Sequence, residues 1–204
     1  MHKSIKYISK ITITAAAIAL SACSVSGPNQ SEAKLSKVLD IAKNTMTRMN
    51  LTDSKVKASE SADLFAINLT DAVNYNKVYN QQISIIAQKD GSFDGFYDNN
   101  LNNIKDSSEK SVFKLEVDGN SNKLIASNSD SNKSVSSGFN MSGLFMGMMI
   151  GNLLSRQSSS GISREQMSRK SSSARSSSSV KSAINSRRAS SRSRAGSGSF
   201  SRGK

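Results

Sequence analysis

Residues 113–126, FKLEVDGNSNKLIA, carry the clearest structural signal in this chain. From Phe113 to Val117, apolar residues alternate with charged ones, so an extended backbone would present one apolar face and one polar face. Asp118-Gly119-Asn120 contains the residue types that favour a tight turn, and Lys123–Ala126 can then return as a second strand. The stretch therefore predicts a β-hairpin in an antiparallel sheet.

Similar but shorter signals precede this hairpin. A β-branched run lies at residues 83–86, Asp90-Gly91 is a hairpin turn signal, and Phe93–Tyr97 is predicted to be the returning strand. The alternation over Phe65–Leu69 predicts a further strand, whereas residues 71–82 fit either a helix or a strand.

An amphipathic helix is predicted before these strands. Ser31 is a suitable N-cap, and Glu32 lies in the first turn, near the positive end of the helix dipole. Apolar residues three and four positions apart then form one stripe: Leu35, Val38, Leu39, Ala42, Met46 and Met49. The stripe indicates packing against a core, with a partner-binding or coiled-coil helix as the alternative. Residues 31–130 are thus expected to form a small α+β domain with one amphipathic helix and a small antiparallel sheet.

A polar linker is expected at residues 131–138, followed by the apolar segment 139–154, FNMSGLFMGMMIGNLL. Gly143, Gly147 and Gly151 are four residues apart, so a helix would align them in a groove where two backbones approach closely. A helix of this length reaches only about 24 Å, less than a hydrocarbon core of about 30 Å. The pattern favours an inserted or self-associating helix, with packing on the domain or a flexible linker as alternatives.

The C-terminal segment 155–204 is rich in serine and strongly basic. It contains nine Arg and three Lys against Glu165 alone, so most of the formal net charge of +13 lies here. Few of its residues are apolar, and it buries too little surface to offset the entropy of ordering, so disorder is expected. Arginine offers a fork of donors to phosphate or carboxylate. The segment is predicted to be either a solvated spacer or an electrostatic arm that binds polyanions through Arg187, Arg188, Arg192 and Arg194.

The N-terminus has the order of a secretion signal. Lysines precede the uncharged stretch Ile11–Leu20, and small residues then lead to the only cysteine of the chain. The run Leu20-Ser21-Ala22-Cys23 resembles the lipobox of bacterial lipoproteins. The resemblance implies cleavage of residues 1–22 between Ala22 and Cys23, a diacylglyceryl group on the Cys23 thiol, and a lipidated tether over residues 23–30. The whole layout also resembles uncharacterised envelope lipoproteins with an apolar glycine-spaced segment and a basic, serine-rich tail.

The amino-acid composition excludes several kinds of catalytic and metal sites. The only histidine is His2, inside the expected signal, so the chain after cleavage lacks the groups for Ser-His-Asp catalysis and for zinc sites built from Cys and His. No cofactor or metal is expected, and a non-enzymatic role is favoured. A hydrolase that uses Asp90, Asp94 and Asp98 is the remaining catalytic hypothesis, although turn-forming Asp explains these positions at least as well.

These features predict a lipid-anchored protein of the cell envelope of a diderm bacterium, with a non-catalytic binding or assembly role. A residue other than Asp at position 24, here Ser24, accompanies outer-membrane sorting in lipoproteins of enteric-type bacteria, and the inner membrane is the alternative location. Expected partners are membrane lipid through Cys23 and anionic material such as lipopolysaccharide, teichoic acid or lipid phosphate. DNA would be bound only nonspecifically, because aromatic residues are scarce in the tail. A homo-oligomeric membrane assembly component that uses the glycine-spaced helix is the second hypothesis.

Overall fold

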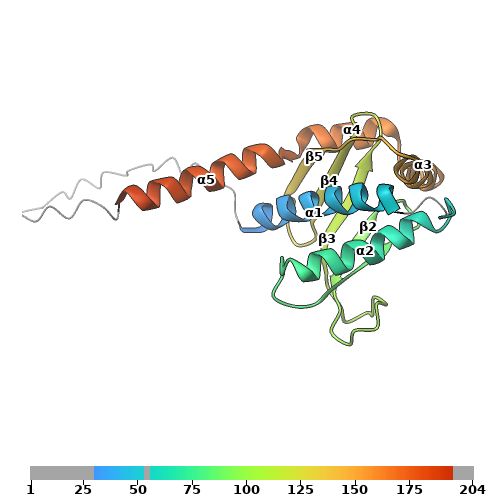
Figure 1. Ribbon diagram of the computed structural model, residues 1–204, viewed down its shortest axis with the longest axis horizontal. Coiled ribbons are helices and arrows are strands. Elements are labelled where there is room, and N and C mark those ends of the chain that lie inside the picture. The colour runs from blue at the N-terminus through green and yellow to red at the C-terminus, as the bar shows by residue number, and fades with distance from the viewer. Residues whose placement is uncertain (1–29, 53–55, 195–204) are drawn as a thin grey trace, which may run out of the picture.

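The computed structural model describes residues 30–52 and 56–194 of the 204-residue chain. Within these ranges the elements follow in the order α1 (Gln30–Thr52), α2 (Ser61–Tyr75), β1 (Ile83–Ala87), β2 (Phe93–Tyr97), β3 (Ser111–Asp118), β4 (Lys123–Asn128), β5 (Ser134–Gly138), α3 (Leu144–Ser159), α4 (Arg164–Ser173), β6 (Arg175–Ser176) and α5 (Ser177–Arg194). The predicted α+β class is confirmed. Figure 1 shows α1 and α2 in front of a twisted sheet, with α4 near its upper edge and α5 extending away from the body.

The sheet is a meander with one short added strand. Strands β1 to β5 pair antiparallel in sequence order, and β6 pairs with β5 in parallel. Both predicted hairpins are confirmed, since Ile85 pairs with Gly95 in the first and Leu115 with Ala126 in the second. The prediction of a purely antiparallel sheet is wrong at β6, because this strand follows α4 and runs in the same direction as β5.

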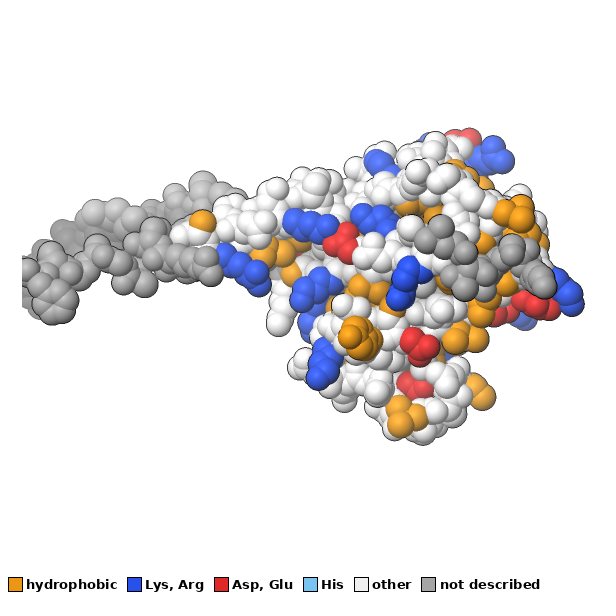
Figure 2. Space-filling view, viewed as in Figure 1, with side chains coloured by type: hydrophobic (Ala, Val, Ile, Leu, Met, Phe, Trp, Pro, Cys, Tyr) orange, Lys and Arg blue, Asp and Glu red, His pale blue; other side chains and the backbone are white. Residues whose placement is uncertain are grey.

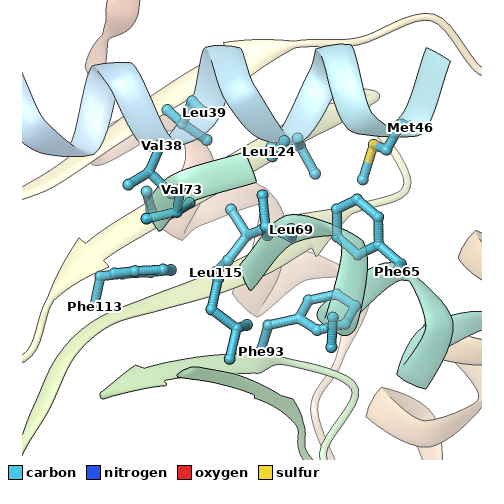
Figure 3. Close-up of a cluster of buried hydrophobic side chains, with 14 of the residues drawn as sticks. Val38, Leu39, Met46, Phe65, Leu69, Val73, Phe93, Phe113, Leu115 and Leu124 are labelled. Carbon is cyan, nitrogen blue, oxygen red and sulfur yellow. The ribbon is translucent and has the colours of Figure 1, made fainter. Parts of the chain in front are cut away.

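One apolar core lies between α1, α2 and the sheet. The predicted stripe of α1 is confirmed, because all six of its apolar residues are at most 4% exposed. Figure 3 shows side chains of the two helices and the sheet meeting in this core, among them Val38, Leu39, Met46, Phe65, Leu69, Val73, Phe93, Phe113, Leu115 and Leu124. Burial of apolar surface contributes about 25 cal/mol per Å², so this layer is the main source of stability.

The strand predicted at Phe65–Leu69 is wrong, because these residues lie in helix α2. Phe65, Leu69 and Val73 are four residues apart and buried, whereas Ile67 is 60% exposed. The ambiguous segment 71–82 finishes α2 and then runs irregularly to β1. Helix and strand periods share positions in a short apolar run, so periodicity alone does not separate them.

The apolar segment 139–154 belongs largely to α3, which packs on the domain. The buried face of this helix consists of Phe145, Met146, Met149, Ile150, Leu153 and Gln157. The predicted three-glycine groove does not form, because Gly143 precedes the helix as its N-cap with a φ of 110° and lies against Asn50. Gly147 and Gly151 are exposed on the helix, and a Cβ at either would have no neighbour within 4 Å. Self-association through these two glycines stays a prediction.

Two expectations about polar segments are corrected. The linker expected at residues 131–138 contains β5. The disorder expected from residue 155 onward is wrong as far as residue 194, because this part forms the end of α3, then α4, β6 and α5. Residues 195–204 lie outside the described residues. The domain therefore extends well beyond the boundary expected at residue 130.

The serine-rich part is ordered by a few well-placed side chains. Met167 and Ala174 pack on Ile125 at the face of the sheet opposite the main core, and Val180 of α5 joins the main core. Ser163 and Gln166 form a capping box at the start of α4, which satisfies backbone N–H groups that have no partner within the helix. The residue composition predicted too little order, because Met167, Ala174 and Val180 are few but all lie on packing faces.

Candidate functional site: a basic helix and a carboxylate loop

Helix α5 concentrates positive charge on a regular support. It carries five basic residues and no acidic one: Lys181, Arg187, Arg188, Arg192 and Arg194. Its beginning is fixed to the body, since Val180 is fully buried and the Ser177 and Ser36 hydroxyl oxygens are 2.6 Å apart. Lys181 also forms an ion pair with Asp40 at 2.7 Å. The turns that hold the four arginines therefore extend from an anchored base.

This basic helix leaves the body at the end where α1 begins. Figure 1 shows the red end of α5 extending past the blue start of α1 and away from the sheet. An ion pair of 3.2 Å between Arg175 and Glu32 holds the chain just before α5 to the first turn of α1. Figure 2 shows several Lys and Arg side chains where α5 leaves the body. The start of the described chain and the basic helix thus share one end of the molecule.

The predicted polyanion-binding arginines lie on α5, whereas the predicted lipobox does not fall in the described part of the chain. Arg187 and Arg188 are exposed on α5, and Arg192 and Arg194 belong to the same helix, although their side chains lie outside the described part. The lipobox with Ala22 and Cys23 also lies outside the described residues. Of the helices that the structure describes, none combines the length and the apolarity needed to cross a membrane.

The second unusual feature is residues 98–109, which connect β2 to β3 and are called the carboxylate loop below. The loop projects at the bottom of Figure 1, and its Leu101 and Ile104 are 65% and 64% exposed. Its base is closed by a backbone hydrogen bond from Tyr97 N–H to the Lys110 carbonyl. Because these two apolar side chains are exposed and do not pack on the body, contacts at the base of the loop must hold it in place.

Buried carboxylates provide this order at both ends of the loop. Asp98 is only 4% exposed and accepts hydrogen bonds from the Ser84 hydroxyl at 2.7 Å and the Asn103 N–H at 2.9 Å. Burial opposes its ionisation, but these hydrogen bonds lower the pKa of Asp98 below the ordinary value. Glu109 accepts from the backbone N–H of Asn99 at 2.8 Å and that of Asp106 at 3.1 Å. The two side chains tie the loop to itself and to β1.

The other two carboxylates of the catalytic hypothesis lie outside this loop in the chain, and each forms an ion pair with a lysine. Asp90, in the β1–β2 turn, pairs with Lys114 at 2.8 Å, and Asp94 of β2 pairs with Lys105 at 2.7 Å. Burial opposes ionisation of Asp90, but hydrogen bonds from Lys114 and Ser92 lower its pKa. The lowered pKa keeps Asp90 a charged acceptor, which is the opposite of the raised pKa that a general acid needs.

Two open clefts flank α1. One of about 720 Å³ lies between α1 and the β4–β5 region and is lined mainly by amides and hydroxyls, including Asn44, Thr47, Asn50, Asn122 and Asn140. The other, of about 1190 Å³, runs between α1 and α2 past Ile41, Met49, Leu64 and Tyr75. Neither lining includes a pair of carboxylates.

Comparison with known proteins gave no relative: no family model matches the chain, and neither a curated protein nor a solved structure is significantly similar to it. Arguments about function therefore rest on the residues and their geometry. Sequence reasoning treated Asp98 as a turn residue or a catalytic carboxylate and did not connect it with Glu109. The signal that could have done so is the run of oxygen-bearing side chains at Asp98, Asn100, Asn102, Asp106 and Glu109.

Proposed function

We propose that this chain is a lipid-anchored protein of the bacterial envelope with a non-catalytic role, in which α5 contacts an anionic surface next to the anchor. The observation that carries the proposal is the shared end of the molecule: α5 leaves the body beside the start of α1. The proposed anchor, Cys23, precedes α1 by only seven positions. An acyl anchor and the basic helix would therefore act on the same surface.

Chain geometry supports this placement. A fully extended chain spans at most about 3.3–3.6 Å per residue, so the stretch from Cys23 to Gln30 reaches no more than about 25 Å. Helix α5 is itself about 27 Å long at 1.5 Å per residue. A protein anchored at Cys23 thus keeps the arginines of α5 within reach of lipid headgroups or of polymers attached near them.

Electrostatic attraction would make the binding of α5 to an anionic surface more favourable. Each Lys or Arg near an anionic membrane surface contributes about 1 kcal/mol, and the effect decays within a Debye length of about 8 Å at physiological salt. The diacylglyceryl group proposed at Cys23 already carries two acyl chains, which suffice for stable anchoring, so the basic helix would add affinity for anionic headgroups and orient the domain. The ligand class is anionic lipid phosphate, lipopolysaccharide or teichoic acid, and DNA would bind by the same phosphate contacts without sequence preference.

The experiment uses the full chain after the signal, with Cys23→Ser to remove the lipid, titrated onto anionic and neutral vesicles at two salt concentrations. We expect binding to anionic vesicles only, with affinity that falls steeply as salt rises. A variant in which serine replaces Arg187, Arg188, Arg192 and Arg194 together should lose most of the binding to anionic vesicles.

The matched control removes four exposed positive charges elsewhere, by changing to serine Lys57, Lys77, Lys110 and Lys133. This control should keep most of the binding, because its lysines do not lie on α5. Equal losses in both fourfold variants would contradict a role for α5, as would binding to anionic vesicles that persists at high salt.

A second candidate function, assembly through α3, is favoured by one observation. Gly147 and Gly151 leave the exposed face of α3 without side chains, so a second helix could approach its backbone closely. Gly143 does not contribute, because it lies before the helix. The contact area offered by two glycines is smaller than that of the expected three-point groove.

A further inference from the structure

The carboxylate loop matches a metal-binding sequence pattern along its whole length. Residues 98–109 read DNNLNNIKDSSE. The twelve-residue calcium loop of EF-hands follows D-x-[D/N]-x-[D/N]-G-x5-E, with ligands at positions 1, 3, 5, 7, 9 and 12. Those positions are here filled by Asp98, Asn100, Asn102, Ile104, Asp106 and Glu109. All except Ile104 carry a side-chain oxygen, and position 7 contributes its backbone carbonyl in the known pattern.

The one departure from the pattern is at position 6, where Asn103 replaces glycine. That position needs a sharp turn, which glycine supplies through a positive φ. Asn103 has a φ of 59° and therefore adopts the left-handed conformation that the pattern requires. Asparagine is among the few non-glycine residues that adopt it readily. The substitution thus preserves the backbone path.

The charge of the loop is compatible with a bound cation. Asp98 is 4% exposed and Glu109 is 6% exposed, yet within the described part of the chain neither they nor Asp106 form an ion pair. The loop's own Lys105 pairs with Asp94 instead. Buried charges in proteins are normally paired or coordinate metals. Asp98 and Glu109 accept hydrogen bonds from the Ser84 hydroxyl and from backbone N–H groups, and a bound cation would neutralise the negative charge that these neutral donors leave.

The three carboxylates of the loop do not converge on one point in this conformation, so ion binding would have to draw Asp98, Asp106 and Glu109 together. In the described ranges, no three Asp, Glu, His or Cys side chains are grouped closely enough to hold a metal ion. The amides of Asn100 and Asn102 currently donate to Asp106, at 2.7 and 3.5 Å. Amide oxygens and nitrogens exchange places when the amide turns over, so both side chains can present an oxygen to a cation in place of these donors.

We infer that the carboxylate loop binds one Ca²⁺ ion, through carboxylate oxygens of Asp98, Asp106 and Glu109, amide oxygens of Asn100 and Asn102, and the carbonyl of Ile104. Six to eight oxygen ligands in flexible geometry suit Ca²⁺, whereas Mg²⁺ requires a stricter octahedron and retains several waters. The absence of nitrogen and sulfur ligands disfavours zinc and copper. The loop joins two strands rather than two helices, so only the loop itself resembles an EF-hand.

Binding is measured on the full chain after the signal, with Cys23→Ser, by luminescence of Tb³⁺ as a probe of calcium sites and by its displacement with Ca²⁺. Tyr97 directly precedes Asp98 in the chain and can serve as the energy donor for Tb³⁺. We expect saturable emission, displacement by Ca²⁺ at about 10⁻⁴–10⁻³ M as in extracellular modules, and a higher thermal midpoint in Ca²⁺. Calorimetry with CaCl₂ alone should give one site per chain.

Two variants and one control make the result specific. Glu109→Gln should weaken Ca²⁺ binding at least tenfold, because it removes the charged bidentate ligand. Asn102→Ala, at an exposed position, tests the same site if Glu109→Gln impairs folding. Asp130→Asn, in the β4–β5 turn, makes a similar charge change outside the loop and should leave binding intact. Absence of saturable Ca²⁺ binding, binding unchanged in both loop variants, or tighter binding of Mg²⁺ than of Ca²⁺ would overturn the inference.

Discussion

The hydroxyl oxygens of Ser36 in α1 and Ser177 in α5 lie 2.6 Å apart in the protein interior, although 141 residues separate them in the chain. The contact fixes the serine-rich C-terminal part to the first helix of the domain. Both residues are at most 3% exposed, so neither hydroxyl has water as an alternative partner. Together with buried Val180 and the Lys181–Asp40 ion pair, this contact fixes the base from which α5 extends.

We predict that this hydrogen bond behaves as a buried pair. Ser177→Ala should lower the free energy of unfolding by about 1–3 kcal/mol, because it leaves the Ser36 hydroxyl buried without a partner. The double change Ser36→Ala with Ser177→Ala should be less destabilising than the sum of the single changes. Urea denaturation of the four proteins measures this coupling, and strictly additive effects would show that the two hydroxyls do not interact.

Asp118 should make stability depend on pH. Its carboxylate is fully buried and accepts 2.5 Å hydrogen bonds from the hydroxyls of Ser121 and Ser171, which joins α4 to the β3–β4 turn. Burial opposes ionisation, but these bonds lower the pKa of Asp118 below its ordinary value of 3.8. A depressed folded-state pKa stabilises the protein above the unfolded value, and this contribution is lost as pH falls through the folded pKa.

Asp118→Asn is therefore expected to be destabilising at pH 7 by about 1–3 kcal/mol, the cost of weakening charged hydrogen bonds in the interior. The difference from the unmodified protein should shrink below pH 4. Urea midpoints at pH 7, 5 and 3 test this, with Asp130→Asn as an exposed-turn control. A difference that stays constant over this range would rule out the ionised state as the cause.

Two glycine substitutions should have opposite effects on stability. Gly91 has a φ of 74°, and a Cβ there would collide with the carbonyl oxygen of Leu153 in α3, so Gly91→Ala should cost about 2 kcal/mol or more. Gly147 lies in the exposed face of α3 with open space around it. Gly147→Ala should therefore stabilise the protein by about 1 kcal/mol through helix propensity. Thermal midpoints of the two variants should move in opposite directions.

Gly147→Leu tests whether α3 associates with a second copy. A leucine side chain at this position would hold two helix backbones apart while leaving the buried face of α3 unchanged. Chemical crosslinking in detergent should then yield fewer oligomers than the unmodified chain does. The control is Ser158→Leu, which adds a leucine at an exposed position of the same helix. A glycine control at Gly161 is avoided, because its φ of 76° would make alanine there strained. An unchanged crosslinking pattern would leave α3 as a structural element only.

Cys23→Ser should abolish lipidation and leave the uncut precursor. The thiol is the only one in the chain, so no other residue can accept the diacylglyceryl group. Cells expressing either form are labelled with a clickable fatty acid, and incorporation is read on the purified protein. Ser21→Ala, which keeps a small residue at its position, should still be labelled. Equal label on the Cys23→Ser form and the unmodified chain would disprove the anchor.

Much of the fold was accessible from local pattern. Residues three and four apart defined the stripe of α1, and Asp-Gly turns between alternating segments placed both hairpins. These features depend on neighbours in the chain, and local stereochemistry determines them. Prediction from local pattern was wrong at Phe65 and Leu69, where helix and strand periodicity coincide. It was also wrong for α4 and α5, because the overall composition does not show where the few apolar residues lie.

The sequence alone predicts the antiparallel hairpins, the amphipathic first helix, the uneven distribution of charge and the residue types available for chemistry, because each is a property of local order or of composition. The contact between Ser177 and Ser36, the position of Gly143 before the helix that holds Gly147, and the burial of Asp98 and Glu109 among hydrogen-bond donors appear only in the folded structure. These facts depend on contacts between residues far apart in the chain. Packing of distant surfaces determines such contacts, and local sequence pattern does not contain that information.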